Sequence, residues 1–425
     1  ALKEYKAAIA DYSVSININP GNAYMYNGRG YAEHQLNDSA LAMADYTKAI
    51  ETDSNYLIAW YNRGVAKNGY KDFNGAISDF SEIIRKDPRY ADAYTGRGMA
   101  YTSLHNYNEA IANFTTAVNT DPGNAALALC QRAQTKTAMK DYTGAIEDYT
   151  LAINAVTGNT ASSSPVSLAE IYNGRGAAAY KAKDVNAAID DYTKAINTDN
   201  TCAPAYLNRG IANAGLLNYK NALSDYSNAI HFDAKNADAF YERGIVKNKL
   251  KNDTGAVNDE SRAIEINPAF ADAYYTRGLV KSEEKNDNDA IKDLDKAIEI
   301  NPGFAAAFFN RGIAKAKLKN DNGALNDESK AIAIDPAYTD AYYNRGVIKA
   351  KEKDDSGAII DYNKAITLNP RFTAAYYDRG VSEDALQDHA GAIKDYSKVI
   401  EIDPGFVMAY YNRGVAKGIS KDDSG

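Results

Sequence analysis

Apolar and polar residues recur along this chain with the spacing of amphipathic helices, and the pattern breaks at regular points. Between Thr339 and Phe372, small and aromatic residues three or four positions apart predict a first helix from about Asp340 to Lys351. A second helix carries Ala358, Tyr362 and Ala365 on one face, again spaced by four and three. The segment therefore predicts two helices that bury one face each against the other.

The ends of these predicted helices have recognisable signals. Numbering the repeat from Thr339, position sixteen is a short polar residue that can accept a hydrogen bond from a free helix amide, so we expect an N-cap there. Pro370 ends the unit, because proline cannot continue a helix. Position sixteen is occupied by Asp38, Asp72, Asn106, Asp141, Asp184, Asn218, Asn252, Asn286, Asn320, Asp354 and Asp388.

The same 34-residue pattern fills nearly the whole chain. An Arg-Gly pair at positions seven and eight recurs with this period, for example at Arg311-Gly312, Arg345-Gly346 and Arg379-Gly380. Glycine is unfavourable inside a helix, so its recurrence indicates a close approach of the neighbouring helix. A fixed period of this length is typical of a solenoid, in which each unit contacts only its neighbours.

The repeats are interrupted once. Residues 155–167 read AVTGNTASSSPVS in place of the usual turn, and this composition is typical of a loop. We expect repeats over 1–157, an inserted loop at 158–168 and further repeats over 169–425, as one continuous solenoid. The insertion is either a tolerated surface loop or a hinge or recognition loop.

The pattern within each repeat resembles a known family. An aromatic residue at position four, Gly at eight, Ala at twenty, an aromatic at twenty-four, Ala at twenty-seven and Pro at thirty-two are similar to the tetratricopeptide repeat, as in Trp60, Gly64, Ala76, Phe80 and Pro88. The resemblance implies an all-α, right-handed superhelical solenoid of about twelve helix-turn-helix repeats. It also implies a protein-interaction scaffold without enzymatic activity.

Charges in the repeat predict a structural pairing. Position seven is Arg where the family usually carries a large aliphatic residue, and position twenty-three is Asp in step with it. Because a guanidinium can bind a carboxylate through two parallel hydrogen bonds, we expect a bridge between the two helices of each repeat. The alternative is a row of Arg side chains that faces a ligand. The predicted pairs include Arg63 with Asp79, Arg209 with Asp225, Arg311 with Asp327, Arg345 with Asp361 and Arg379 with Asp395.

Two carboxylates lie in the predicted core. Glu260 and Glu328 occupy position twenty-four, which is aromatic in most repeats. Charged groups are rarely buried without a partner. We expect Lys247 and Lys315, at position eleven of the same repeats, to be their partners.

The resemblance also implies where a partner binds. In tetratricopeptide proteins the first helices line a concave surface, and positions two, five, six, nine, twelve and thirteen tend to face the ligand. Tyrosine offers contact area at low entropic cost and Asn can bond a peptide backbone, so a groove for a protein or an extended peptide is one interpretation. The other is that these rings pack between repeats. The candidates at position five are Tyr61, Tyr241, Tyr275, Phe309, Tyr343, Tyr377 and Tyr411, and at position six Asn62, Asn208, Asn310, Asn344 and Asn412.

Composition narrows the remaining possibilities. The net charge is −8, which argues against a general binder of nucleic acid or of anionic membranes. No run of apolar residues is long enough for membrane insertion, and four scattered histidines predict no metal site. We find no catalytic residues and no cofactor motif. Cys130 and Cys202 fit a cytoplasmic protein as well as a bacterial periplasmic or cell-surface one, so the compartment stays open.

A second hypothesis comes from the chain ends. Residues 1–22 read as a second helix alone and the residues from Val407 onward as a first helix alone. Two copies of the chain could complete a repeat head-to-tail, and such heterologous contacts give rings or filaments. The other interpretation is that the sequence is a fragment of a longer array.

Overall fold

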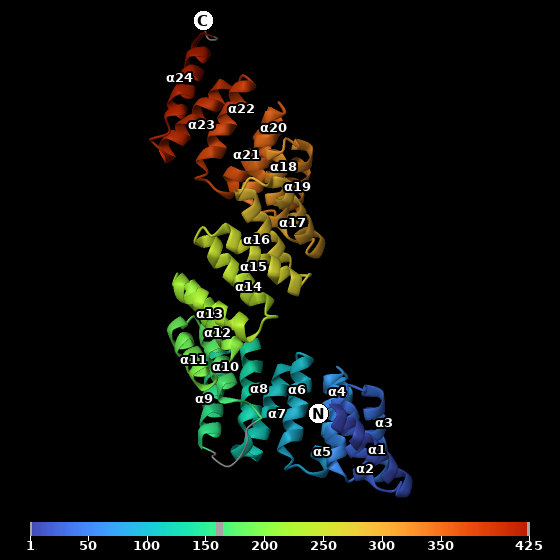
Figure 1. Cartoon of the computed structure of the whole chain (residues 1–425). Coiled ribbons are helices and arrows are strands. Elements are labelled where there is room, and N and C mark those ends of the chain that lie inside the picture. The colour runs from blue at the N-terminus through green and yellow to red at the C-terminus, as the bar shows by residue number, and fades with distance from the viewer. Residues whose placement is uncertain (1, 159–164, 423–425) are drawn as a thin grey trace. The chain divides into compact units, whose positions relative to one another are not determined.

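The computed structural model describes residues 2–158 and 165–422, and over these residues it contains 24 α-helices, one short 3-10 helix (Pro122–Asn124) and no strand (Figure 1). The predicted all-α fold is thus confirmed. The chain divides into two compact units, Ala1–Phe232 and Asp233–Gly425. In the described part of the chain, no helix is both long and apolar enough to cross a membrane.

The helices alternate between the first and the second helix of a repeat. Even-numbered helices up to α24 are first helices and odd-numbered ones are second helices. In the first unit they are α1 (Leu2–Ile18), α2 (Ala23–Gln35), α3 (Ser39–Thr52), α4 (Leu57–Gly69), α5 (Phe73–Lys86), α6 (Ala91–Ser103), α7 (Tyr107–Thr120), α8 (Ala126–Ala138), α9 (Tyr142–Gly158), α10 (Leu168–Lys181), α11 (Val185–Thr198), α12 (Ala203–Gly215) and α13 (Tyr219–Phe232).

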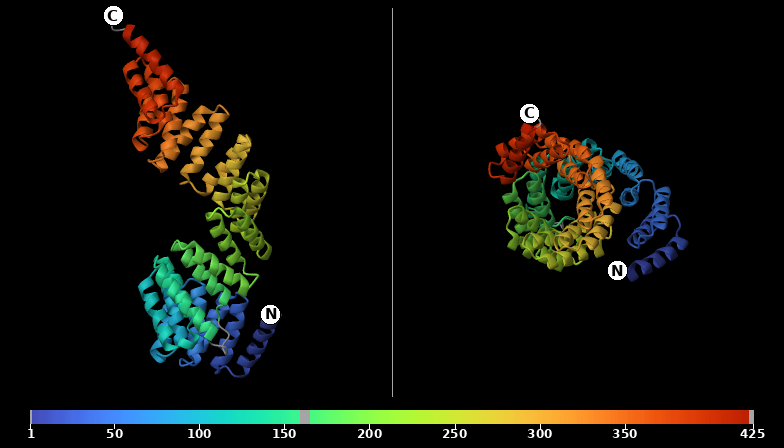
Figure 2. Two further views of the ribbon diagram at one scale, coloured as in Figure 1. Left: turned by 90° about the vertical axis from the view of Figure 1, so that its left-hand side faces the viewer. Right: turned by 90° about the horizontal axis from the view of Figure 1, so that it is seen from above.

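The second unit continues the same alternation. Its helices are α14 (Ala237–Lys249), α15 (Asp253–Ile266), α16 (Ala271–Glu283), α17 (Asp287–Ile300), α18 (Ala305–Lys317), α19 (Asp321–Ile334), α20 (Thr339–Lys351), α21 (Asp355–Leu368), α22 (Thr373–Ala385), α23 (His389–Ile402) and α24 (Val407–Asp422). Within each unit every first helix packs against the second helix that follows it, and successive pairs stack side by side (Figure 2).

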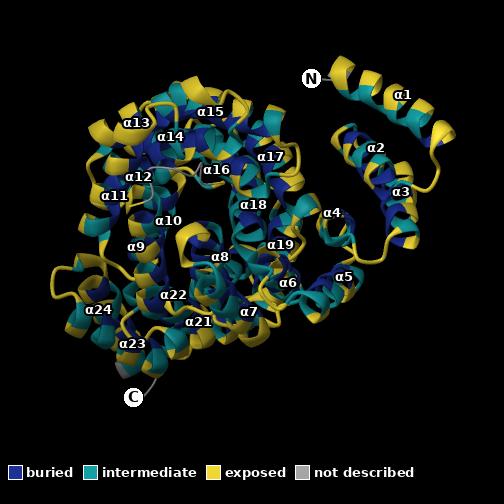
Figure 3. Ribbon diagram, turned by 90° about the horizontal axis from the view of Figure 1, so that it is seen from below, coloured by how far each residue is buried: buried dark blue, intermediate teal, exposed yellow. Residues whose placement is uncertain are grey.

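Small residues allow the two helices of a repeat to approach closely. Ala341, Ala358 and Ala365 are fully buried, and the ring of Tyr362 lies directly on Gly346. A methyl group on Gly346 would come within 2.7 Å of that ring, so only glycine fits. The helix-weakening glycine is therefore a packing residue, as the sequence predicts. Buried positions lie where the helices of a unit face one another (Figure 3).

The turn between the two helices confirms most of the predicted N-caps and adds a feature that the sequence does not reveal. Side chains at position sixteen accept a hydrogen bond from the third amide of the next helix in nine repeats, although Asn106 makes no such bond. The residue just before the cap has a left-handed backbone, with φ between 60° and 69°. This residue is never glycine; it is Asn37, Lys71, His105, Lys140, Lys183, Leu217, Lys251, Lys285, Lys319, Lys353 or Gln387.

Helix α9 continues to Gly158, so residues 155–157, whose composition is typical of a loop, are helical and belong to the first array as expected from the 1–157 boundary. Residues 159–164, which make up much of the expected loop at 158–168, lie outside the described part of the chain. Ser167 caps α10 in a reciprocal capping box with Glu170. Tyr149 and Ile153 of α9 and Ile171 of α10 share one core cluster, so the helices on either side of the insertion pack together within the first unit.

Candidate functional site on the first helices

The arginine at position seven connects the two helices of its own repeat. Arg345 donates from Nε and Nη2 to the two oxygens of Asp361, at 2.9 and 2.6 Å, and Asp361 is only 1% exposed. Lys349 lies 2.8 Å from the same carboxylate. The same bidentate pair of hydrogen bonds joins Arg63 to Asp79, Arg209 to Asp225, Arg311 to Asp327 and Arg379 to Asp395.

The same arginine also reaches the preceding repeat. Its Nη1 donates to the side chain at position twenty-five of the previous second helix, as from Arg345 to Ser329 at 3.1 Å and from Arg63 to Thr47 at 3.1 Å. The guanidinium also lies over the aromatic ring at position four, 5.7 Å from the ring of Tyr342 in the first case. With its hydrogen-bonding groups occupied in this way, the arginine row stabilises the stacking of repeats and does not form a free anion site.

One prediction about these charges is wrong. Lys247 and Lys315 do not pair with Glu260 and Glu328. Lys247 lies 2.7 Å from Asp259, and Lys315 lies 2.8 Å from Asp327, so each joins the Arg–Asp pair. Both glutamates are buried, and none of their carboxylate oxygens has a hydrogen-bond partner. The aspartate at position twenty-three lies on the side of the second helix that faces position eleven. It is therefore closer to the lysine than the glutamate at position twenty-four is.

Two repeats replace the lysine at position eleven by glutamate. Glu383 stands next to Asp395, and Glu33 stands next to Asp45, at the same place as Lys349 beside Asp361. Burial and the adjacent aspartate raise the pKa of each glutamate to about 7. These two repeats therefore hold an acid pair where others hold an ion pair.

The aromatic rings at position five pack between repeats. Tyr343 lies 4.8 Å from the ring of Phe372, and Tyr275 lies 4.7 Å from that of Phe304, measured between ring centroids. Phe372 and Phe304 immediately precede the next first helix. Tyr61, Tyr241, Phe309 and Tyr377 make the same contact with Tyr90, Phe270, Tyr338 and Phe406. Tyr411 is 65% exposed.

The asparagines at position six bond to neighbouring repeats. Asn310 donates to the Tyr275 hydroxyl at 3.1 Å, and Asn412 donates to the Tyr377 hydroxyl at 3.0 Å. Asn62 and Asn208 donate to Asn27 and Asn173 of the preceding repeats, whereas Asn344 lies against Glu328. Apart from Tyr411, these Tyr, Phe and Asn side chains contact neighbouring residues of the stack in this structure, and their role in binding a partner stays a prediction.

An exposed apolar row runs along position nine of the first helices, which the sequence reading did not single out. In the first unit it comprises Tyr31, Val65 and Met99, which are 48%, 40% and 37% exposed. In the second unit Val347, Val381 and Val415 continue it with similar exposure. We call these residues the position-nine row. Their aliphatic character at the partner-facing position is the signal that could have identified them.

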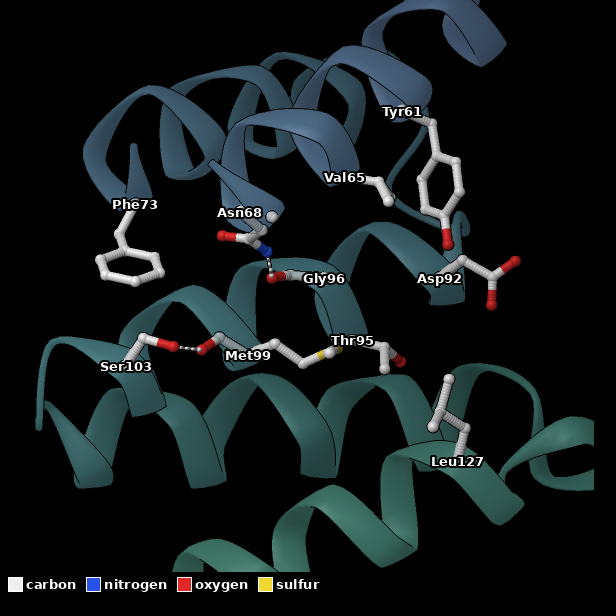
Figure 4. A pocket seen from close by; sticks show the side chains of 11 residues that line it. Tyr61, Val65, Asn68, Phe73, Asp92, Thr95, Gly96, Met99, Ser103 and Leu127 are labelled. Atoms are coloured by element: carbon white, nitrogen blue, oxygen red, sulfur yellow. Dashed lines mark hydrogen bonds between the residues drawn. The ribbon is translucent and has the colours of Figure 1, made fainter. Parts of the chain in front are cut away.

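A cavity lies over the position-nine row in the first unit, beside Val65 and Met99. It has a volume of about 460 Å³ and is formed by residues of α4, α5, α6 and α8 (Figure 4). Tyr61 and Asp92 lie at one end, and Phe73 and Ser103 lie at the other. The cavity residues are Tyr61, Val65, Asn68, Gly69, Phe73, Asp92, Thr95, Gly96, Met99, Ser103 and Leu127.

Two small residues of α6 line this cavity. Thr95 occupies position five, which is Tyr or Phe in most later repeats, and Gly96 occupies position six. The Phe80 ring fills the place of the missing Gly96 side chain, since a methyl group there would come within 2.5 Å of that ring. Among the predicted position-five and position-six residues, only Tyr61 lines this cavity.

The polar groups of the cavity are few. Burial raises the pKa of Tyr61 to about 12, so its hydroxyl remains a neutral donor. Asn68 donates to the carbonyl of Gly96 at 3.0 Å, while its own side-chain oxygen is buried without a partner. Burial also raises the pKa of Asp92 above its ordinary value. A mainly apolar cavity with a few oriented polar groups is typical of ligand sites in proteins.

Comparison with known families agrees with the repeat geometry. The sequence model of the tetratricopeptide repeat matches residues 91–124, 271–304 and 339–372, and a second model of this repeat matches 1–56 and 356–405. The chain is a tetratricopeptide repeat protein. Proteins of this family serve as scaffolds for interactions between proteins, and this broad role extends to the chain.

Several solved structures are similar to parts of this chain. YrrB, described as having an unusual peptide-binding site, is 27% identical over 43% of this chain and 95% of its own, with a TM-score of 0.39. MamA is 25% identical over 38% of this chain and 94% of its own, with a TM-score of 0.37. A repeat protein from Parabacteroides merdae is 19% identical over 59% and 98%, with a TM-score of 0.43. A search of curated proteins found no match.

Proposed function

We propose that this tetratricopeptide repeat protein binds an extended peptide of a partner protein across the first helices of its first unit. The observation that supports this most strongly is the cavity between α4 and α8, since its lining, apart from Phe73, comes from positions of the first helices that face the ligand in this family. A large apolar side chain of the peptide enters this cavity. The adjoining residues of the position-nine row contact the rest of the peptide.

The exposure of the lining supports this role. Val65 and Met99 leave more than a third of their surface in water, although similar side chains are usually buried. Covering them removes apolar surface from water at about 25 cal/mol per Å². Apolar patches that are not covered within a monomer commonly mark interaction sites. The exposed part of these two side chains lines the cavity and can be covered by a partner.

Selection from a library of random extended peptides tests the proposal. The wild-type chain should enrich peptides with one large apolar residue at a fixed place. Met99→Glu should abolish the enrichment, because a charge in the cavity would lose its hydration there. Leu41→Glu is the matched control, because Leu41 is also exposed but lies on the second helix α3. Equal enrichment by Met99→Glu and by the wild type would contradict the proposal.

Head-to-tail assembly of the chain remains a separate prediction. Light scattering over a range of protein concentrations tests it. A mass that grows with concentration would support it, and a constant mass of 46.2 kDa would oppose it.

A further inference from the structure

Glu260 takes the place of an aromatic ring in the second unit, and a cavity lies beside it. Position twenty-four is filled by Tyr362 and Tyr396 in later repeats, and both rings are almost fully buried. Glutamate is shorter and leaves part of that space empty. The resulting cavity of about 270 Å³ lies between α14 and α16. Its walls include Ile245, Leu279 and Val280.

The carboxyl group in this cavity is not satisfied by its neighbours. Glu260 is 1% exposed, and neither of its oxygens has a hydrogen-bond partner. The Thr276 hydroxyl faces it but donates to the backbone carbonyls of Asp272 and Ala273, at 3.0 and 3.3 Å. Lys247 is held by Asp259. A buried carboxylate without a donor is unfavourable, so a donor that enters the cavity would stabilise the ionised form of Glu260.

Several charged groups surround Glu260. Burial raises the pKa of its carboxyl group to about 8, while the Thr276 hydroxyl and Arg277 favour the charged form. The carboxylates of Asp259 and Asp293 oppose ionisation. Exposed Lys249 and Glu283 stand at the rim of the cavity. The empty site therefore holds a protonated carboxyl group at neutral pH, and an entering cation would release that proton to solvent.

We propose that this cavity binds a primary alkylammonium group. The methylene chain lies against Ile245, Leu279 and Val280, and the nitrogen donates to both oxygens of Glu260. The lysine side chain of a partner protein and a free alkylamine share this chemistry. The site lies in the second unit and does not depend on the peptide cavity of the first.

Other ligands fit the site less well. Calcium and magnesium require several oxygen ligands, and no group of three or more His, Cys, Asp or Glu side chains suited to a metal occurs among residues 2–158 and 165–422. A purely apolar ligand would fill the cavity but leave Glu260 without a donor. An alkylammonium group meets both requirements of the cavity, since it has an apolar stem and a charged donor at its end.

Methyl NMR of the full chain tests the proposal, with the signals of Ile245, Leu279 and Val280 as reporters. The probes are N-acetyl-lysine methylamide, n-butylammonium and N-acetyl-norleucine methylamide, which has a similar side chain without the charge. The titration is made above the pKa of Glu260, so that the carboxylate is ionised. We expect the two cationic probes to bind at least roughly ten-fold more tightly than the norleucine probe. The tighter of the two cations identifies the source.

Three variants separate charge from shape. Glu260→Gln keeps the shape of the side chain and should remove the preference for the cationic probes. Glu260→Tyr should fill the cavity and abolish binding of all three probes. Glu328→Gln is the matched control, because Glu328 is equally buried two repeats later, and it should bind like the wild type. Equal binding of the lysine and norleucine probes, or an unchanged preference in Glu260→Gln, would overturn the proposal.

Discussion

Replacing Asp361 by alanine should destabilise its repeat strongly. The carboxylate accepts two hydrogen bonds from Arg345 and lies 2.8 Å from Lys349. Its removal leaves two cations without their counter-charge. Breaking a buried ion pair in this way costs about 3–5 kcal/mol. The side chains of Arg345 and Lys349 are 20% and 25% exposed, so water can solvate the two cations in part. We therefore expect Asp361→Ala to lower the free energy of unfolding by about 2–3 kcal/mol.

The measurement is the free energy of unfolding from urea titrations, together with hydrogen exchange of the α20 and α21 amides. Exchange is needed because repeat arrays do not always unfold in one step. Glu401→Ala is the control, since Glu401 pairs with Lys398 on the surface. Its loss should cost less than about 1 kcal/mol. A cost for Asp361→Ala equal to that of the control would refute a structural role for the Arg–Asp pair.

A paired replacement extends this test. The variant that changes both Arg345 and Asp361 to leucine removes both charges of the pair. Only Lys349 is then left without its carboxylate partner. Buried ion pairs can often be replaced by apolar residues at little cost. We expect this double variant to be more stable than Asp361→Ala by about 1 kcal/mol or more. A double variant that is less stable than Asp361→Ala would show that the pairing does more than neutralise charge.

Three further predictions concern single residues. Glu383, whose pKa is raised to about 7 by burial and by Asp395, binds its proton more tightly in the folded chain, so its contribution to stability should be lost as pH rises from about 4.5 to 7. Glu383→Lys should make this slope shallower and add about 1–2 kcal/mol at pH 8 in urea titrations, while Glu33 keeps its own share of the slope. Glu260→Tyr should raise the midpoint of thermal unfolding, because the ring fills the cavity and adds about 1–3 kcal/mol to the free energy of unfolding. A lower midpoint would contradict the claim that the cavity can take a tyrosine ring. Lys353→Gly should stabilise by about 1 kcal/mol, because φ is 69° there, whereas Lys364→Gly inside α21 should destabilise by a similar amount.

Much of the fold could be predicted because the same residue types recur at the same positions in successive repeats. Gly346 and Tyr362 lie sixteen residues apart, and their contact follows from the helix period and from the missing side chain. The pairing of Arg345 with Asp361 follows from the same spacing and from opposite charge. The left-handed backbone at Lys353 could not be predicted, since a lysine gives no local signal for positive φ.

The site was harder to predict than the fold. For the position-five aromatic residues the sequence left both a partner groove and packing between repeats open, and it cannot say that the ring of Tyr343 packs on Phe372. The cavity lies beside Thr95 and Gly96, and whether a neighbouring ring fills the space next to a small residue can be seen only once the surrounding helices are in place. The partner of a buried charge depends on side-chain direction, which explains the wrong assignment for Glu260 and Glu328.

The most direct measurement is the affinity of one selected peptide, labelled with a fluorophore, for four forms of the full chain. These are the wild type, Val65→Glu, Met99→Glu and Leu41→Glu. Exposed substitutions change stability little, so all four should be folded, which circular dichroism verifies. If the first-helix cavity is the peptide site, Val65→Glu and Met99→Glu should each weaken binding at least roughly ten-fold, and Leu41→Glu should bind like the wild type. Equal affinities in all four forms would contradict the account.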